Sequence, residues 1–134
     1  SIQKIGNILL IDDSYNASPE SVLEALNLLV TKGGRHYFVF GDMLELGENS
    51  LKFHIDILNY AIKLNVAGIV MVTKQFKNKE ILDNLREFNI SIVNNPEDAI
   101  ISLEKWLTKG DTLLLKGSRN VGLEKLIPCI KARF

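Results

Sequence analysis

Short apolar segments alternate with longer amphipathic segments along the whole chain. The apolar segments are residues 7–12, 36–40, 67–73, 90–93 and 112–115, and they are rich in Val, Ile, Leu and Phe. Continuous apolar runs of this length are typical of strands that are buried on both faces of a sheet. The pattern therefore predicts five buried strands.

The intervening segments place apolar residues at helical spacing. The first opens at Ser18 and Pro19, where Ser18 can cap the helix and Pro19 suits its first turn. A second helix is predicted to begin with Ser50 as its cap, and others over residues 78–87, after Asn95 and over residues 121–132.

This alternation predicts the fold class and the domain organisation. Strands that alternate with helices favour an α/β fold with an open, mostly parallel, Rossmann-like sheet of five to six strands and helices on both faces. The 134 residues fit a single domain, 1–134, without linker or internal repeat. We expect this domain to be excised from a larger protein.

Composition narrows the possible functions. Hydrophobic residues make up 46% and charged residues 24% of the chain, which is ordinary for a globular protein. The 16 basic and 16 acidic residues give a net charge of +0, which argues against a non-specific nucleic-acid binder. The single cysteine, Cys129, excludes an internal disulfide, suits a reducing compartment and is expected to be a buried small apolar residue. No apolar run approaches the ~20 residues of a membrane span.

Polar residues gather where the predicted strands end. Ligands of open α/β sheets bind beyond the carboxyl ends of the strands, so we expect these loops to converge on one edge. We expect Asn95 to be only a helix cap, and Thr73 and Lys74 to be solvated loop residues. The residues are Asp12, Asp13, Ser14, Tyr15 and Asn16 after the first strand; Gly41, Asp42 and Glu45 after the second; Thr73 and Lys74; Asn94 and Asn95; and Lys116, Gly117, Ser118 and Arg119 after the fifth.

Several common site signatures are absent from the sequence. There is no P-loop, no Gly-x-Gly-x-x-Gly dinucleotide fingerprint and no Gly-x-Ser-x-Gly nucleophile elbow. The two histidines, His36 and His54, lie far apart without ligand-spaced partners, so no metal site is expected. We expect His36 to be structural or exposed, and His54 to lie at the surface or at its boundary with the core.

A phospho-acceptor receiver domain is the best alternative that follows from the residues alone. Receivers also have five β-α units, and Asp12, Asp13 and Lys116 fit their acids and lysine. Such a domain needs a phosphorylatable aspartate at the end of the third strand. This strand ends in Thr73 and Lys74, so phosphoryl transfer to the domain is not expected.

Three segments together resemble the C-terminal domain of the peptidoglycan Mur ligases, and in particular of those that add D-Ala-D-Ala. The first is DSYNASP at residues 13–19, and the second is GDMLELG at residues 41–47, followed by His54. The third is KGSR at residues 116–119, followed by Glu124. One departure is Ser18, where the family often has Asn, and either residue can cap a helix.

The resemblance implies a three-domain cytoplasmic enzyme of which this chain is the last domain. The N-terminal domain would hold the UDP-sugar, and the central domain would hold the P-loop, ATP, Mg and a carbamylated lysine. ATP would phosphorylate the carboxylate of UDP-MurNAc-tripeptide, and the amine of D-Ala-D-Ala would attack the acyl phosphate. The C-terminal domain would act as a mobile lid. The isolated domain is expected to be inactive and to bind ATP weakly.

The resemblance also implies roles for individual residues. Asp13, Tyr15 and Asn16 match positions near the ribose and base of the nucleotide. The segment that faces the amino substrate is matched by Lys116, Gly117, Ser118 and Arg119. Supporting roles fall to Asp12, Asp42, Glu45 and His54, and no catalytic residue is expected in this domain. The alternative for Asp42 is a simple ion pair with Lys116 or Arg119.

Two readings without catalysis remain open from the sequence. The chain could be a stand-alone nucleotide-binding or receiver-like module, or an α/β scaffold for a protein partner. The ligase interpretation requires that Asp13 and Arg119 lie on one rim. It would be refuted if the two residues lay on opposite sides of the molecule.

Overall fold

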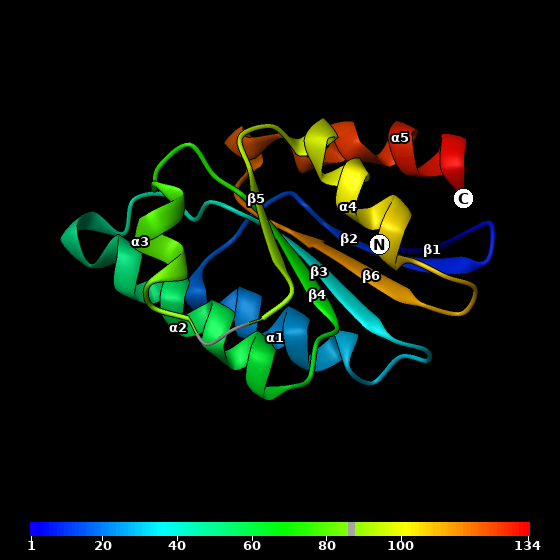
Figure 1. The fold of residues 1–134 in the computed structure, drawn as a ribbon, viewed down its shortest axis with the longest axis horizontal. Helices are drawn as coiled ribbons and strands as arrows, with labels where there is room; N and C mark the ends of the chain where they lie inside the picture. Colours follow the sequence, from blue (N-terminus) through cyan, green and yellow to red (C-terminus); the bar gives the residue numbers. More distant parts are fainter. Residues whose placement is uncertain (86–87) are drawn as a thin grey trace.

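A six-stranded sheet forms the centre of the computed structural model, which describes residues 1–85 and 88–134. The strands lie in the order β1-β2-β6-β3-β4-β5 (Figure 1). All neighbouring pairs are parallel except β1 and β2. The strands are β1 (Ile2–Ile5), β2 (Ile8–Asp13), β3 (His36–Gly41), β4 (Gly68–Val72), β5 (Ile90–Val93) and β6 (Thr112–Lys116). The predicted α/β class and all five predicted strands are confirmed.

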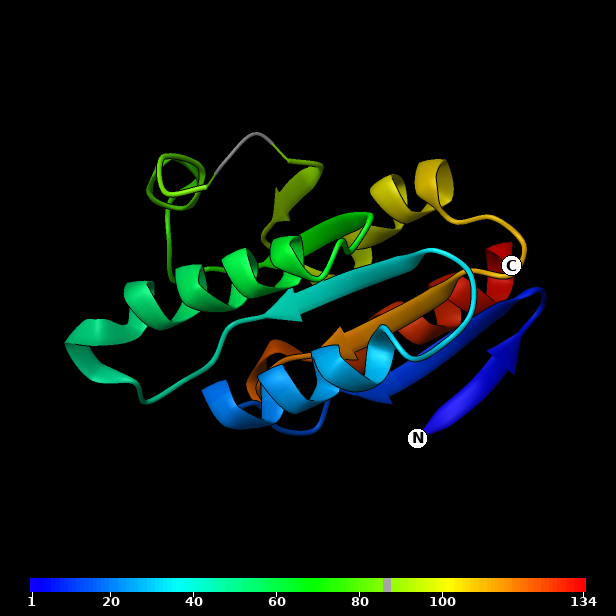
Figure 2. The same cartoon turned by 90° about the horizontal axis from the view of Figure 1, so that it is seen from below.

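Helices cover both faces of this sheet. Figures 1 and 2 show α1, α2 and α3 on one face and α4 and α5 on the other. The helices are α1 (Pro19–Leu29), α2 (Ser50–Lys63), α3 (Asn78–Leu82), α4 (Ala99–Trp106) and α5 (Leu126–Arg133). Short 3₁₀ turns cover Gly47–Asn49, Pro96–Asp98, Arg119–Val121 and Leu123–Lys125.

The ends of the helices test the predicted caps. The cap at Ser18 is confirmed, because the Ser21 amide donates to Ser18 Oγ at 3.2 Å and Ser21 Oγ accepts from the Ser18 amide at 2.9 Å. The cap at Ser50 is wrong: Ser50 is the first residue of α2, after a 3₁₀ turn. Asn95 precedes the turn Pro96–Asp98 without a side-chain cap bond.

Two predicted helices differ from the observed ones. The helix expected over residues 78–87 ends at Leu82, and positions 86–87 of that prediction lie outside the described residues. The helix expected from residue 121 begins only at Leu126, because Gly122 adopts a left-handed φ of 74° that separates two 3₁₀ turns. A right-handed helix cannot run through Gly122 in this conformation, so the helix cannot begin at residue 121.

Alternate residues of the strands build two apolar cores, one on each face. On the α1–α2 face, Phe38 and Phe40 of β3 pack with Leu114 of β6. On the α4–α5 face, Val39 and Leu115 point the other way. Cys129 packs against this second core but is only partly buried, so its predicted full burial is wrong.

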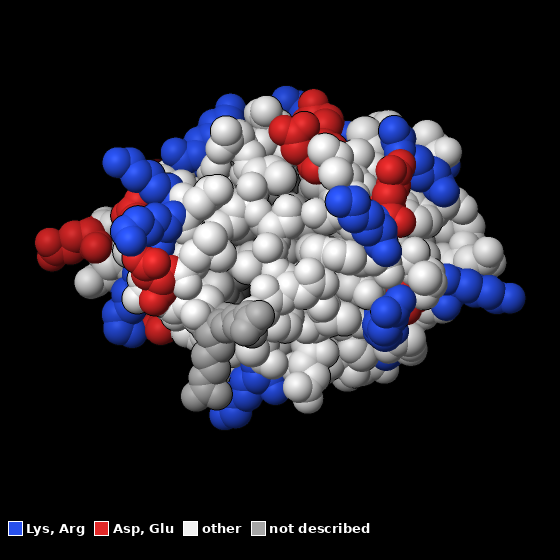
Figure 3. Space-filling view, viewed as in Figure 1, with Lys and Arg blue, Asp and Glu red and all other residues white. Residues whose placement is uncertain are grey.

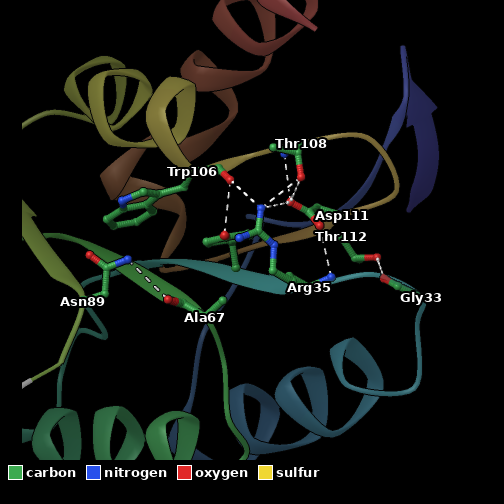
Figure 4. A network of polar contacts seen from close by, with 9 residues as sticks. Gly33, Arg35, Ala67, Asn89, Trp106, Thr108, Asp111 and Thr112 are labelled. Carbon is green, nitrogen blue, oxygen red and sulfur yellow. Dashed lines mark hydrogen bonds and ion pairs between the residues drawn. The ribbon is translucent and has the colours of Figure 1, made fainter.

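A polar network ties together the amino ends of β3 and β6 (Figure 4). Asp111 is 3% exposed and accepts from the Arg35 amide at 3.1 Å and the Thr108 amide at 2.8 Å. The Arg35 guanidinium also reaches Asp111 at 3.3 Å. Beside it, half-buried His36 contacts the Lys32 carbonyl oxygen at 2.7 Å, a structural contact as expected. The network fixes the end of the sheet opposite the polar loops.

Among the described residues, charged side chains form no large patch of one sign on the face drawn in Figure 3. Lys, Arg, Asp and Glu side chains are interspersed around the periphery of that face, and its centre is mostly uncharged. This agrees with the balanced composition. In the described part of the chain, no helix has the length and apolar character needed to cross a membrane.

Candidate functional site

The loops after β2, β3 and β6 converge at the carboxyl edge of the sheet, as predicted. The strand β6 lies between β2 and β3, and the register pairs Lys116 with Asp13 on one side and with Phe40 on the other. Side chains that are 103 positions apart in the sequence therefore meet at the ends of adjacent strands.

An ion pair between Asp13 and Lys116 occupies the centre of this edge. Lys116 Nζ donates to Asp13 Oδ2 at 2.8 Å. The side chain of Lys116 is 4% exposed, whereas that of Asp13 is 47% exposed. A buried ammonium requires a counter-charge, and Asp13 supplies it. The alternative ion pair between Asp42 and Lys116 does not form, because Lys116 pairs with Asp13.

The loop after β2 is shaped by its own acid. Asp12 Oδ1 accepts from the Ser14 amide at 3.2 Å and from Ser14 Oγ at 2.6 Å. Such a bond from an aspartate to the backbone two residues later stabilises a turn. It leaves Tyr15 and Asn16 exposed at the tip of the loop.

The loops after β2 and β6 touch through Tyr15 and Arg119. The Arg119 guanidinium carbon lies 5.0 Å from the centre of the Tyr15 ring, and Nη1 donates to the Tyr15 hydroxyl at 3.3 Å. Both residues line a hollow of about 480 Å³ together with Asp12, Asp13 and Glu124. Asp13 and Arg119 therefore share one rim, which is the arrangement that the sequence interpretation requires.

A second pocket, of about 270 Å³, lies between the loops after β3, β4 and β6. The Ser118 amide donates to the Asp42 carbonyl oxygen at 3.1 Å, and Asp42 Oδ2 accepts from the Lys74 amide at 3.2 Å. Among the described residues, Asp42 Oδ1 and Ser118 Oγ are buried without a hydrogen-bond partner. Buried polar atoms are normally paired, so this wall is suited to a ligand with polar groups. Glu97 and Lys125 also line the pocket.

The loop after β4 begins with a threonine that is buried and hydrogen-bonded, contrary to expectation. Thr73 is 2% exposed, and its hydroxyl oxygen accepts from the amides of Gln75 at 3.1 Å and Phe76 at 3.3 Å. Its predicted role as a solvated residue is wrong, because the hydroxyl closes the turn after β4. Lys74 is exposed, as predicted. Gln75 contributes to the same region through a bond from Ser50 Oγ at 2.6 Å, and no signal in the sequence pointed to it.

His54 is fully buried, and the predicted surface or boundary position is wrong. The Met43 amide donates to His54 Nε2 at 2.9 Å, so the proton lies on Nδ1, which contacts the Ser50 carbonyl oxygen at 2.7 Å. Burial lowers the pKa of His54 below its ordinary value, and the bond to Ser50 and the charge of Asp42 oppose this in part. The neutral ring thus anchors the loop 41–47 to α2.

Two glycines let the loops after β3 and β6 approach closely. A Cβ atom added to Gly117 would lie 2.9 Å from Gly41 Cα. Neighbouring Glu45 has a left-handed φ of 61°, and it lines a shallow hollow of about 240 Å³ with Asn16, Ser118 and Arg119. Residues of all three loops, namely Asn16, Glu45, Ser118 and Arg119, therefore lie around one hollow.

The arrangement supplies groups for binding. It offers a half-exposed carboxylate, an exposed aromatic ring, a guanidinium and a polar pocket. Across residues 1–85 and 88–134, no group of three or more His, Cys, Asp or Glu side chains is placed to hold a metal ion.

Comparison with known proteins identifies the family. The model of the family described as "Mur ligase, glutamate ligase domain" matches residues 1–119. The chain belongs to this family.

The relatives of this Mur ligase domain carry a more specific name. The UDP-N-acetylmuramoyl-tripeptide–D-alanyl-D-alanine ligase of Buchnera aphidicola subsp. Acyrthosiphon pisum is 34% identical over 90% of this chain and 26% of its own length. The Escherichia coli protein of that name is 30% identical over 97% of this chain and 28% of its own length. The Mur ligase domain thus spans less than a third of these relatives.

Solved structures support the fold of the Mur ligase domain. The crystal structure of MurF ligase from Thermotoga maritima in complex with ADP has a TM-score of 0.82 and 27% identity, covering 98% of this chain and 30% of that one. A MurF crystal structure from Acinetobacter baumannii has a TM-score of 0.87 and 26% identity over 98% of this chain and 30% of its own.

Proposed function

We propose that the Mur ligase domain is the C-terminal part of an ATP-dependent ligase that joins D-Ala-D-Ala to UDP-MurNAc-tripeptide in peptidoglycan precursor synthesis. The names of its relatives support this substrate pair. The longer protein would contain an N-terminal domain for the UDP-sugar and a central domain with the P-loop. Because ATP and UDP-linked precursors are cytoplasmic, the enzyme would act there.

The observation that carries this proposal is the shared rim of Asp13 and Arg119. The half-exposed carboxylate of Asp13 is suited to accept hydrogen bonds from the ribose hydroxyls of ATP. The exposed ring of Tyr15 offers a surface for stacking, and Asn16 offers an amide beside it. The MurF ligase from Thermotoga maritima was solved in complex with ADP, which supports nucleotide binding within the family.

The amino substrate would bind on the side of the loop after β6. Arg119 is exposed, and its planar guanidinium matches the terminal carboxylate of D-Ala-D-Ala. Ser118 and Asp42 would supply polar contacts in the adjacent pocket, where each has an unpaired buried oxygen. Gly117 keeps the backbone close enough to Gly41 to form this wall.

The reaction consists of two balanced steps. The tripeptide carboxylate takes the γ-phosphoryl group of ATP and releases ADP. The neutral amine of D-Ala-D-Ala then attacks the acyl phosphate, forms the amide, releases inorganic phosphate and loses a proton. Magnesium, which supplies charge neutralisation for phosphoryl transfer, would be held mainly by the central domain.

The test is D-Ala-D-Ala-dependent release of ADP by the full-length protein. Asp13→Ala is expected to raise the KM for ATP, and Arg119→Ala to raise mainly the KM for D-Ala-D-Ala. Lys52→Met is the matched control, since Lys52 pairs with Asp56 on the exposed surface of α2. Unchanged kinetics in both site variants would refute the assignment, and no ADP release with D-Ala-D-Ala would refute the function.

The isolated domain gives a second test. Two charged hydrogen bonds of roughly 1.5–3 kcal/mol each, less the cost of association, leave a Kd for ATP near or weaker than about 1 mM. Calorimetry on the 134-residue chain should therefore detect little or no binding. A micromolar Kd would contradict the view that this domain supplies only part of the nucleotide site.

A further inference from the structure

We infer that Lys116 is a positioning residue that holds the Asp13 carboxylate for the nucleotide, and that Lys116 does not contact the amino substrate. This inference rests on the proposed function, because it takes Asp13 as the ribose contact. It gives Lys116 a role different from that of Gly117, Ser118 and Arg119, which are proposed to face the amino substrate.

Burial is the first argument. Lys116 is the last residue of β6, in the interior of the sheet, and its side chain is 4% exposed. Its ammonium is directed to Asp13 Oδ2 at 2.8 Å. Arg119, three residues later, is exposed. Of these two cations, Arg119 is therefore the one that can reach a ligand from solvent.

The geometry around Asp13 is the second argument. The register of β2 and β6 places the two residues directly opposite each other. Within residues 1–85 and 88–134, Lys116 is the one hydrogen-bond donor to the Asp13 side chain, and it uses Oδ2. Oδ1 is left for a ligand, on a side chain that is 47% exposed. The ion pair thus fixes the rotation of the carboxylate while half of it faces the hollow.

Charge is the third argument. A buried charge is stable only beside a counter-charge, so Lys116 and Asp13 are tied to each other more tightly than an exposed pair would be. A ligand hydroxyl that binds Asp13 therefore meets a carboxylate already oriented by the protein. Orientation of a binding group before the ligand arrives reduces the entropic cost of binding.

The experiment measures the Kd for ADP by calorimetry and the KM values for ATP and D-Ala-D-Ala in the full-length protein. The variants are Lys116→Met, Lys116→Arg, Asp13→Asn and the double variant Lys116→Met/Asp13→Asn, with Lys52→Met as control. All are compared below the melting transition of the least stable variant.

Lys116→Met is expected to weaken ADP binding and to raise the KM for ATP by about tenfold, a loss of the size of one charged hydrogen bond. The KM for D-Ala-D-Ala should stay within about twofold of the wild-type value, since no contact to that substrate is removed. Lys116→Arg should recover most of the ADP affinity. The double variant should bind ADP no more weakly than the single variant with the lower ADP affinity, because both substitutions disrupt the same Asp13–Lys116 ion pair.

The outcomes separate this inference from the proposed function. A raised KM for D-Ala-D-Ala with unchanged ADP binding in Lys116→Met overturns the inference alone, as do additive effects or no recovery in Lys116→Arg. ADP binding without D-Ala-D-Ala-dependent turnover in the wild type overturns the function alone. No ADP binding by the wild-type protein overturns both.

Discussion

The ion pair between Asp13 and Lys116 predicts an asymmetric effect on stability. Asp13→Ala leaves an ammonium whose side chain is 4% exposed without its counter-charge. Lys116→Met instead leaves a carboxylate that is 47% exposed and can be hydrated. We therefore expect Asp13→Ala to destabilise the domain more than Lys116→Met, although Asp13 is the residue nearer the surface.

The magnitude follows from the exposure of the two partners. Breaking a fully buried pair by removing one partner costs about 3–5 kcal/mol, and losing one charged hydrogen bond costs about 1.5–3 kcal/mol. Truncation of Asp13 admits some water, so the lower range applies and we expect about 2 kcal/mol. Lys116→Met keeps most of the side-chain volume and should cost less than about 1 kcal/mol. In the double variant Asp13→Ala/Lys116→Met the unpaired charge is absent, so this variant should be about 1 kcal/mol more stable than Asp13→Ala.

Urea denaturation of the isolated chain, followed by circular dichroism, measures these free energies of unfolding. A loss of 2 kcal/mol corresponds to a fall in Tm of about 8 °C for a domain of this size. The reasoning is refuted if Lys116→Met costs more than Asp13→Ala, or if the two losses simply add in the double variant.

Three further predictions concern the framework around the site. Because folding lowers the pKa of His54, the unfolded chain binds a proton at this residue below about pH 6.5 and the folded chain does not. The free energy of unfolding should therefore fall as the pH drops from 7.5 to 5.5. In urea titrations, a His54→Gln variant should show a weaker dependence of this free energy on pH. Gly117→Ala should cost about 1–3 kcal/mol, and Gly33→Ala, where nothing lies within 4 Å of the added Cβ, should cost far less in the same assay. Asp111→Ala should lower the free energy of unfolding by about 3 kcal/mol, because it leaves buried amides unpaired. Asp56→Ala breaks an exposed ion pair and should change this free energy by less than about 1 kcal/mol. Equal losses in the two variants would show that burial of the acid is irrelevant.

The strands could be predicted wherever the sequence has a continuous run of apolar residues. Both faces of β3 and β6 are covered, so their runs are continuously apolar and easily recognised. The strand β1 was not expected, because it is a short edge strand in which polar Gln3 and Lys4 lie next to each other between two isoleucines and only Ile5 is buried. Its pairing with β2 depends on the turn that joins them, which carries little signal in isolation.

The site could be predicted in outline but not in its pairings. The rule that ligands bind at the carboxyl ends of parallel strands was sufficient to bring Asp13 and Arg119 to one rim. It did not indicate which acid pairs with Lys116, since that depends on strand order in the sheet. Burial of His54 and Thr73 was also unexpected, because it results from packing of α2 and the loop after β4 against the loop 41–47.

The contact between Gly41 and Gly117 limits how this domain can be re-engineered. Grafting the 116–119 segment from a relative would bring in a backbone path shaped by that relative's own partner segment. With the native segment at 41–47 still in place, there is little room for a mismatch, because even a Cβ atom added to Gly117 would lie 2.9 Å from Gly41 Cα. Chimaeras of this domain should therefore exchange both segments together, since the two backbones pack directly against each other.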